Sequence, residues 1–114
     1  MANCIFCKII ARQIPAKIIY EDAAVLVFHD LQPQAPVHLL VIPKQHLDRI
    51  SDIDEKTVLG VGNMVLAANR LAKELSIAEP GYRLVINCNP DGGQSVYHLH
   101  LHLLGGRKMT WPPG

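Results

Sequence analysis

The chain has 114 residues, of which 49% are hydrophobic and 18% charged, so its length suits one compact domain over residues 1–114. This composition is typical of a globular protein and excludes a disordered chain or a repeat array. The formal net charge is only +1, and the eleven Lys and Arg residues are scattered along the chain. The basic surface of a duplex nucleic-acid binder is therefore excluded, and a small molecule is the expected partner.

The apolar stretches are all shorter than the roughly 20 residues that a membrane-spanning helix needs, and the first residues lack the basic and apolar regions of a signal peptide. We therefore expect a cytoplasmic protein without a membrane partner. The three cysteines do not suggest a disulfide framework. Two of them, Cys4 and Cys7, have the C-x-x-C spacing that in a reducing compartment more often binds a metal or does redox chemistry.

The first half of the chain predicts one short helix and three strands. The helix is expected over residues 4–11, before the break at Ile14-Pro15. Runs of β-branched and apolar residues predict strands at 17–21, 24–29 and 37–42. Asp22 separates the first two strands as in a hairpin, and prolines at 36 and 43 bound the third.

The second half predicts one long helix and two more strands. Apolar residues recur every three or four positions from about 54 to 75, and Gly60 and Gly62 weaken this helix without removing it. Strands are expected at 82–88 and 96–104, joined by the turn-rich segment 89–93. Sequential strands with short connections favour a five-stranded antiparallel sheet with helices on one face, which is an α+β fold with one long and one short helix.

The last predicted strand carries three histidines, His98, His100 and His102, in alternation with leucines. Side chains two residues apart in a strand point to the same side, about 6.6 Å apart along the chain. The three imidazoles therefore share one face, while the intervening leucines pack into the core on the other. A buried imidazole without a partner carries a desolvation cost, so three in alternation indicate chemistry rather than packing.

Imidazole is well suited to attack on phosphorus. Its neutral form is common near pH 7, and water readily removes a phosphoryl group from its nitrogen. The segment Asp-Gly-Gly-Gln-Ser at 91–95 precedes the histidines, and its glycines allow backbone N–H groups to approach phosphoryl oxygens, while Ser95 adds a hydroxyl. The pattern predicts covalent catalysis by histidine on a phosphorus bond. Alternatively, the Gly-Gly turn is only a hairpin connection.

The segment 98–104, His-Leu-His-Leu-His-Leu-Leu, resembles the defining motif of the histidine triad (HIT) family. Four further segments resemble its Hint branch, the histidine triad nucleotide-binding proteins: 29–36, 42–44, 92–97 and the ending Trp-Pro-Pro-Gly at 111–114. The resemblance covers essentially the whole chain. It implies a homodimer whose two five-stranded sheets join into one, and a purine nucleoside phosphoramidase that splits adenosine 5′-phosphoramidates into AMP and an amine.

The resemblance also implies roles for individual residues. His100 matches the nucleophile that forms a nucleotidyl-imidazole intermediate, His102 matches the phosphate ligand, and His38 matches the histidine that supports the nucleophile. Asp30 matches the carboxylate that accepts from both ribose hydroxyls. The base pocket would comprise Phe6, Ile9, Phe28, His29 and Leu31, and the surroundings of the phosphate would comprise Asn87, Gly93, Gln94 and Ser95.

Cys4 and Cys7 combine with His46 and His98 into a potential Cys₂His₂ metal site. Zinc prefers four thiolate or imidazole ligands in a tetrahedron, and a closed site of this kind would be structural, pinning the N-terminal helix to the sheet. The alternatives are two ordinary half-buried thiols or a redox pair. The predicted chemistry at His100 needs no cofactor.

Two other hypotheses stay open. Related enzymes of the same family hydrolyse dinucleoside polyphosphates or transfer a nucleotidyl group to a sugar phosphate. The intact third histidine argues against the transferase, and the Trp-Pro-Pro-Gly ending argues against the polyphosphate hydrolases. A non-catalytic nucleotide-binding or interaction protein would keep the pocket and the dimer without depending on His100.

Overall fold

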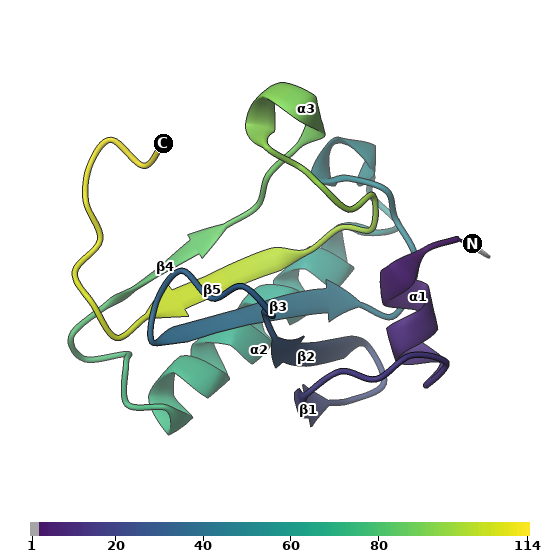
Figure 1. Cartoon of the computed structure of the whole chain (residues 1–114). Helices are drawn as coiled ribbons and strands as arrows, with labels where there is room; N and C mark the ends of the chain where they lie inside the picture. Colours follow the sequence, from purple (N-terminus) through teal and green to yellow (C-terminus); the bar gives the residue numbers. More distant parts are fainter. Residues whose placement is uncertain (1–2) are drawn as a thin grey trace.

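The structure is a computed structural model that describes residues 3–114. Its centre is a five-stranded antiparallel sheet in the order β1-β2-β3-β5-β4 (Figure 1). The strands are β1 (Ile18–Glu21), β2 (Val25–His29), β3 (Val37–Pro43), β4 (Tyr82–Val85) and β5 (Leu101–Gly105), and the helices are α1 (Ile5–Ile10), α2 (Val58–Glu74), α3 (Asn89–Gly92) and the 3₁₀ turn η1 (Ile50–Asp52). The predicted α+β fold is confirmed. Within residues 3–114, no helix combines the length and apolar character needed to cross a membrane.

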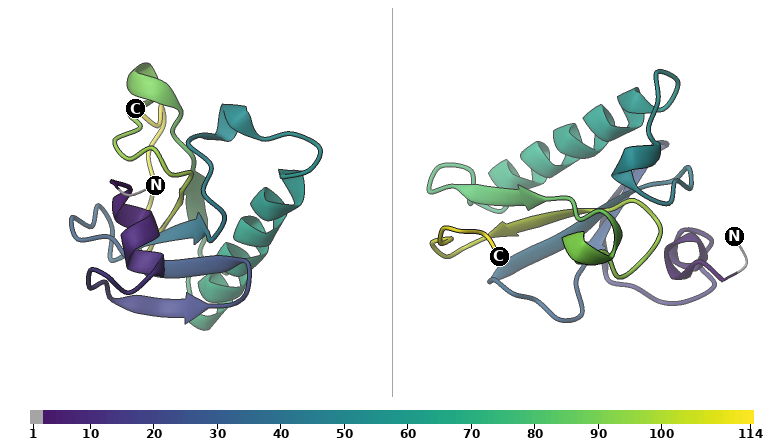
Figure 2. Two further views of the ribbon diagram at one scale, coloured as in Figure 1. Left: turned by 90° about the vertical axis from the view of Figure 1, so that its right-hand side faces the viewer. Right: turned by 90° about the horizontal axis from the view of Figure 1, so that it is seen from above.

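Both faces of the sheet are covered, so the expectation that the helices lie on one face is wrong. Helix α2 packs on one face and α1 lies on the other (Figure 2). The reason is visible in β2 and β3, whose continuous apolar runs alternate between the two sides. Val25, Val27, Leu39 and Val41 face α2, whereas Leu26, Phe28, Leu40 and Ile42 form a second cluster with α1.

The last strand begins five residues after its predicted start at 96, so His98 and His100 precede β5 rather than lie within it. Pro43, at the end of the neighbouring β3, has no N–H group with which to continue the ladder. The N–H of Leu99 donates instead to the carbonyl of Leu47, at 2.7 Å. The alternation nevertheless holds, because the leucines at 99, 101 and 103 lie in the α2 core as predicted.

Three other boundaries differ from the prediction. Strand β4 ends at 85 rather than 88, because residues 86–88 have no partner in β5. Helix α2 starts four residues after 54, since the Asp54 carboxylate accepts the N–H groups of Lys56 and Thr57 and forms a turn first. The segment 89–93 contains the single helical turn α3, which ends at Gly93 in the left-handed region.

Gly105, at the end of β5, has no room for a side chain. A Cβ atom there would lie 2.5 Å from Cδ1 of the buried Ile77. We expect Gly105→Ala to lower the free energy of unfolding by about 1–3 kcal/mol, because the packed core resists overfilling. Gly60→Ala is the matched control: its Cβ would meet nothing within 4 Å, and alanine in a helix is favoured by up to about 1 kcal/mol. Urea denaturation measures both, and an undiminished stability of Gly105→Ala would contradict the close approach.

Candidate functional site

A pocket of about 560 Å³ lies between α1 and the sheet. Its walls include all five residues of the predicted base pocket, namely Phe6, Ile9, Phe28, His29 and Leu31, together with Asp30, Ser95, His100 and His102. The rings of Phe6 and Phe28 meet edge to face, with centroids 5.4 Å apart. One concave site thus unites an aromatic wall from α1 and β2 with a carboxylate and two histidines.

His100 is buried, and its hydrogen bonds fix where its proton lies. Its Nδ1 is 2.8 Å from the carbonyl oxygen of His98. Because a carbonyl oxygen only accepts, Nδ1 carries the proton and the lone pair of the neutral ring is on Nε2. The ring lines the pocket, and Phe6 packs edge-on against it with centroids 5.3 Å apart. His100 therefore has the free nitrogen lone pair that a nucleophile requires.

His102 has the opposite arrangement, and His38 determines it. The N–H of Gln34 donates to Nδ1 of His38 at 3.0 Å, so the proton of His38 is on Nε2. That Nε2–H lies 2.9 Å from Nδ1 of His102 and donates to it. His102 consequently carries its own proton on Nε2 and can donate it to a ligand. His38 thus contacts His102 directly. The His102 ring in turn packs against His100, with ring centroids 5.1 Å apart, so His38 is linked to His100 through His102.

Asp30 directly follows β2 and lies next to His38 and His102. Its Oδ1 accepts the N–H of Gln32 at 2.8 Å, and its Oδ2 lies 3.4 Å from Nε2 of His38. Asp30, His38 and His102 are close enough together to suggest a metal site. The lone pair of neutral His38 already accepts the Gln34 N–H, however, so Nε2 has none to offer a cation. We interpret these three side chains as a polar cluster, in which His38 donates to His102 and the Asp30 carboxylate lies beside the pair.

Burial, together with the neighbouring imidazoles of His100 and His38, lowers the pKa of His102 to about 4. The unfolded chain therefore takes up a proton near the ordinary value of 6.5, whereas the folded chain resists until about 4. It follows that the free energy of unfolding falls as the pH falls from about 6.5 to about 4. His102→Gln should show a shallower fall than wild type in urea denaturation at successive pH values. Equal slopes would contradict this assignment.

The segment 93–95 holds only one residue that lines the pocket, which is Ser95. The side-chain amide of Gln94 is buried: its Oε1 accepts the N–H of Asn89 at 3.0 Å, and its Nε2 donates to the carbonyls of Asp48 and Val96 at 2.7 and 3.0 Å. Gln94 therefore fastens this loop, and its amide is not free for a phosphate.

Gly93 and Asn87, which were also predicted near the phosphate, do not line the pocket. The backbone N–H of Gly93 is used within the α3 turn, where it donates to the carbonyl of Pro90 at 3.0 Å. Neither Gly93 nor Asn87, which lies between β4 and α3, is among the described residues that line the pocket. Conversely, the segment 14–17 also lines the pocket, although the sequence did not predict it there. The Ile14-Pro15 break was the signal, since it turns the chain back across the sheet after α1.

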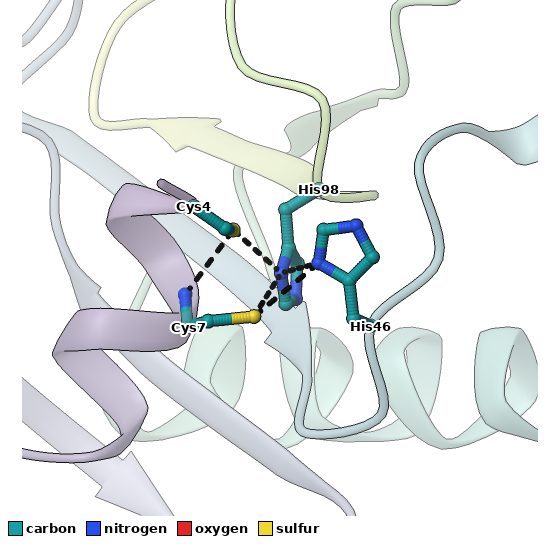
Figure 3. A group of neighbouring side chains, drawn as sticks. All are labelled: Cys4, Cys7, His46 and His98. Atoms are coloured by element: carbon teal, nitrogen blue, oxygen red, sulfur yellow. Dashed lines mark hydrogen bonds between the residues drawn. The ribbon is translucent and has the colours of Figure 1, made fainter. Parts of the chain in front are cut away.

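Cys4, Cys7, His46 and His98 come together as predicted, with their ligand atoms all within 4.8 Å of one another (Figure 3). Sγ of Cys4 lies 3.4 Å from Nδ1 of His98, and Sγ of Cys7 lies 3.3 Å from Nδ1 of His46. The two Nδ1 atoms are 3.1 Å apart. Nitrogen and sulfur ligands at zinc-ligand bond lengths in a tetrahedron would be about 3.3–3.8 Å from one another. The spacing of the four ligand atoms therefore fits zinc.

The protonation of the two histidines supports the same conclusion. Nε2 of the fully buried His98 donates to the carbonyl of Pro43 at 2.9 Å, and Nε2 of His46 donates to the carboxylate of Asp48 at 2.7 Å. Both Nδ1 lone pairs thus face each other and the sulfur atoms, an arrangement that a cation between them would stabilise. Asp48 was not predicted at this site, although its place two residues after His46 was a signal.

Comparison with known proteins identifies the family of the chain. The HIT domain model matches residues 11–109. The crystal structure of a HIT family hydrolase from Legionella pneumophila Philadelphia 1 superposes with a TM-score of 0.96 and 53% identity, covering 98% of this chain and 100% of that one. A HIT-like protein of Synechococcus elongatus is 52% identical over 110 residues, which are 96% of each chain. A 14 kDa zinc-binding protein of Zea mays is 49% identical over 112 residues, which are 96% of this chain and 87% of that one. With its alternating histidines beside the pocket, the chain belongs to the HIT domain family.

Proposed function

We propose that this protein is a nucleotide hydrolase of the Hint type, which cleaves the P–N bond of purine nucleoside 5′-phosphoramidates and releases AMP and an amine. The observation that carries the proposal is the pair of neighbouring histidines with complementary protonation: a free lone pair on Nε2 of His100 and an N–H on Nε2 of His102. The aromatic wall suits a purine base, and the Asp30 carboxylate suits the two ribose hydroxyls.

The proposed reaction has two displacements at phosphorus. Nε2 of His100 attacks the α-phosphorus, the P–N bond breaks, and the amine leaves with the electron pair of that bond and takes up a proton. The ring becomes cationic, and its Nδ1–H stays bonded to the His98 carbonyl. Water then attacks the phosphorus and breaks the P–Nε2 bond, which releases AMP and a proton. Nε2–H of His102 and the hydroxyl of Ser95 stabilise the charge on the phosphoryl oxygens.

A comparison of substrates tests the proposal. The purified protein is incubated with an adenosine 5′-phosphoramidate and, separately, with a diadenosine polyphosphate, and AMP is measured. We expect AMP from the phosphoramidate at a much higher kcat/KM. Preference for the polyphosphate would instead support a polyphosphate hydrolase. AMP binding without turnover of either compound would support a non-catalytic nucleotide-binding protein.

We further propose that Cys4, Cys7, His46 and His98 hold a structural zinc ion. The four ligand atoms and the inward lone pairs support this, as does the similarity to the zinc-binding protein of Zea mays. Bound zinc would supply charge neutralisation for two thiolates and a link between α1 and the sheet. It takes no part in the proposed steps at phosphorus.

We also propose that the protein is a homodimer. Strand β4 is an edge of the sheet, so one row of its N–H and C=O groups faces away from β5. Pairing of two β4 edges would join the sheets of two copies. Analytical ultracentrifugation should therefore give twice the mass of one chain. A monomer at the same concentration would contradict this.

A further inference from the structure

The metal-ligand cluster and the nucleotide pocket are built from the same short helix. Cys4 is the N-cap of α1, its Sγ accepts the N–H of Cys7 at 3.3 Å, and Phe6 lies between the two cysteines. The Phe6 ring packs edge-on against His98 and His100, with centroids 5.9 and 5.3 Å apart. Phe6 thus contacts one candidate metal ligand and the proposed nucleophile, and any displacement of α1 moves a wall of the pocket.

A second link runs through the backbone of His98. Nδ1 of this residue faces the sulfur atoms of Cys4 and Cys7, at 3.4 and 3.6 Å, while its own carbonyl oxygen accepts Nδ1–H of His100. The acceptor of the hydrogen bond that keeps the His100 lone pair on Nε2 is therefore the backbone carbonyl of a candidate metal ligand. If His98 moves, this hydrogen bond and the orientation of the nucleophile change with it.

A third link reaches the loop beside the phosphate. His46 donates to the carboxylate of Asp48, whose backbone carbonyl accepts the amide of the buried Gln94. The next residue, Ser95, lines the pocket. Three separate routes therefore connect the four metal ligands with the residues around the nucleotide.

Apart from the candidate metal site, α1 is held by one small apolar cluster, which it forms with Leu26, Phe28, Leu40 and Ile42. The helix has six residues, too few to be stable by itself. Its two buried side chains, Phe6 and Ile9, are both pocket walls. Without a cation, only weak thiol donors face the Nδ1 lone pairs of His98 and His46, namely Cys4 at 3.4 Å and Cys7 at 3.3 Å.

We propose that zinc and nucleotide bind cooperatively: metal bound by Cys4, Cys7, His46 and His98 raises the affinity of the neighbouring pocket for a purine nucleotide, and Phe6 transmits the effect. The proposal rests on the proposed function only in that the pocket takes a nucleotide. Coupling between two ligands is reciprocal, so bound nucleotide must raise the affinity for zinc by the same factor.

AMP affinity is measured by calorimetry on zinc-loaded protein and on protein depleted by a chelator, with circular dichroism as the control for the sheet. We expect the Kd for AMP to rise roughly 5- to 150-fold on zinc removal while the sheet signal is retained. In competition with a chelator, saturating AMP should lower the Kd for zinc by the same factor. An AMP affinity that is equal in both zinc states would overturn the proposal. It would also be overturned if zinc removal weakened AMP binding only when the circular dichroism signal of the sheet was lost as well.

Phe6→Leu tests the route. It keeps an apolar side chain on α1 but removes the ring contacts with both histidines, so it should shrink the coupling factor while zinc affinity without AMP stays within about 2-fold of wild type. Ile10→Val, on the same helix but outside the pocket wall, is the matched control and should keep the full factor. An undiminished factor in Phe6→Leu would overturn the role of Phe6. Absent coupling with intact phosphoramidate turnover refutes only this inference, whereas coupling without turnover refutes only the proposed reaction.

Discussion

Replacement of His100 by alanine should lower kcat for adenosine 5′-phosphoramidate hydrolysis by about 10⁴-fold or more, the scale of losing an enzymatic nucleophile. Nε2 of His100 carries the free lone pair in the pocket. Nε2 of His102 carries a proton, so His102 cannot replace His100 as the nucleophile. The variant should still fold, because the His100 ring contributes to the pocket rather than to the α2 core. Steady-state kinetics with AMP detection measures the effect.

Two controls accompany His100→Ala. The variant itself should bind AMP with a Kd within about 10-fold of wild type, since Asp30 and the aromatic wall remain. His29→Gln removes another histidine of the pocket wall, on β2, and should raise KM rather than abolish kcat. Turnover by His100→Ala at the wild-type rate would show that the nucleophile is misassigned.

The double variant Cys4→Ser with Cys7→Ser should lose bound zinc and melt about 10 °C or more below the wild type. Two of the four ligands come from the start of α1, so their loss detaches the helix from the sheet and exposes the cluster of Phe6, Leu26 and Phe28. Metal analysis and differential scanning calorimetry on the same samples measure zinc content and Tm.

Cys88→Ser is the matched control for the double variant. Cys88 is likewise half-buried, but it contacts Ser51 and lies outside the metal-ligand cluster. This variant should keep about one zinc per chain and a Tm within a few degrees of wild type. If the double variant also kept about one zinc per chain, the ion would be bound elsewhere.

Local patterns predicted the fold well, and long-range partners explain the exceptions. The bounds of α1 and β2 follow from local signals, namely the Ile14-Pro15 break and a β-branched apolar run, and both agree with the structure within one residue. The alternation of histidines and leucines is correct even where no ladder forms, because it depends only on an extended backbone. Where β5 starts depends instead on Pro43 at the end of a neighbouring strand 55 residues away from His98.

The sequence predicted which residues gather at the site but not their protonation or their hydrogen-bond partners. All residues assigned to the base pocket line one cavity, and the four predicted metal ligands form one cluster. The protons on these histidines are fixed by the backbone N–H of Gln34 and by the carbonyls of Pro43 and His98, which no residue pattern encodes. The amide of Gln94 likewise faces the backbone and not the pocket, a choice that a side chain's type leaves open.

The central claim is that His100 is a covalent nucleophile, and the stereochemistry at phosphorus tests it most directly. An adenosine 5′-phosphoramidate made chiral at phosphorus by a sulfur substitution is hydrolysed in ¹⁸O-labelled water, and the configuration of the product is determined. Attack by His100 followed by attack of water is two inversions, so this account predicts net retention of configuration. Inversion would mean that water attacks the substrate directly, and would contradict the covalent role of His100.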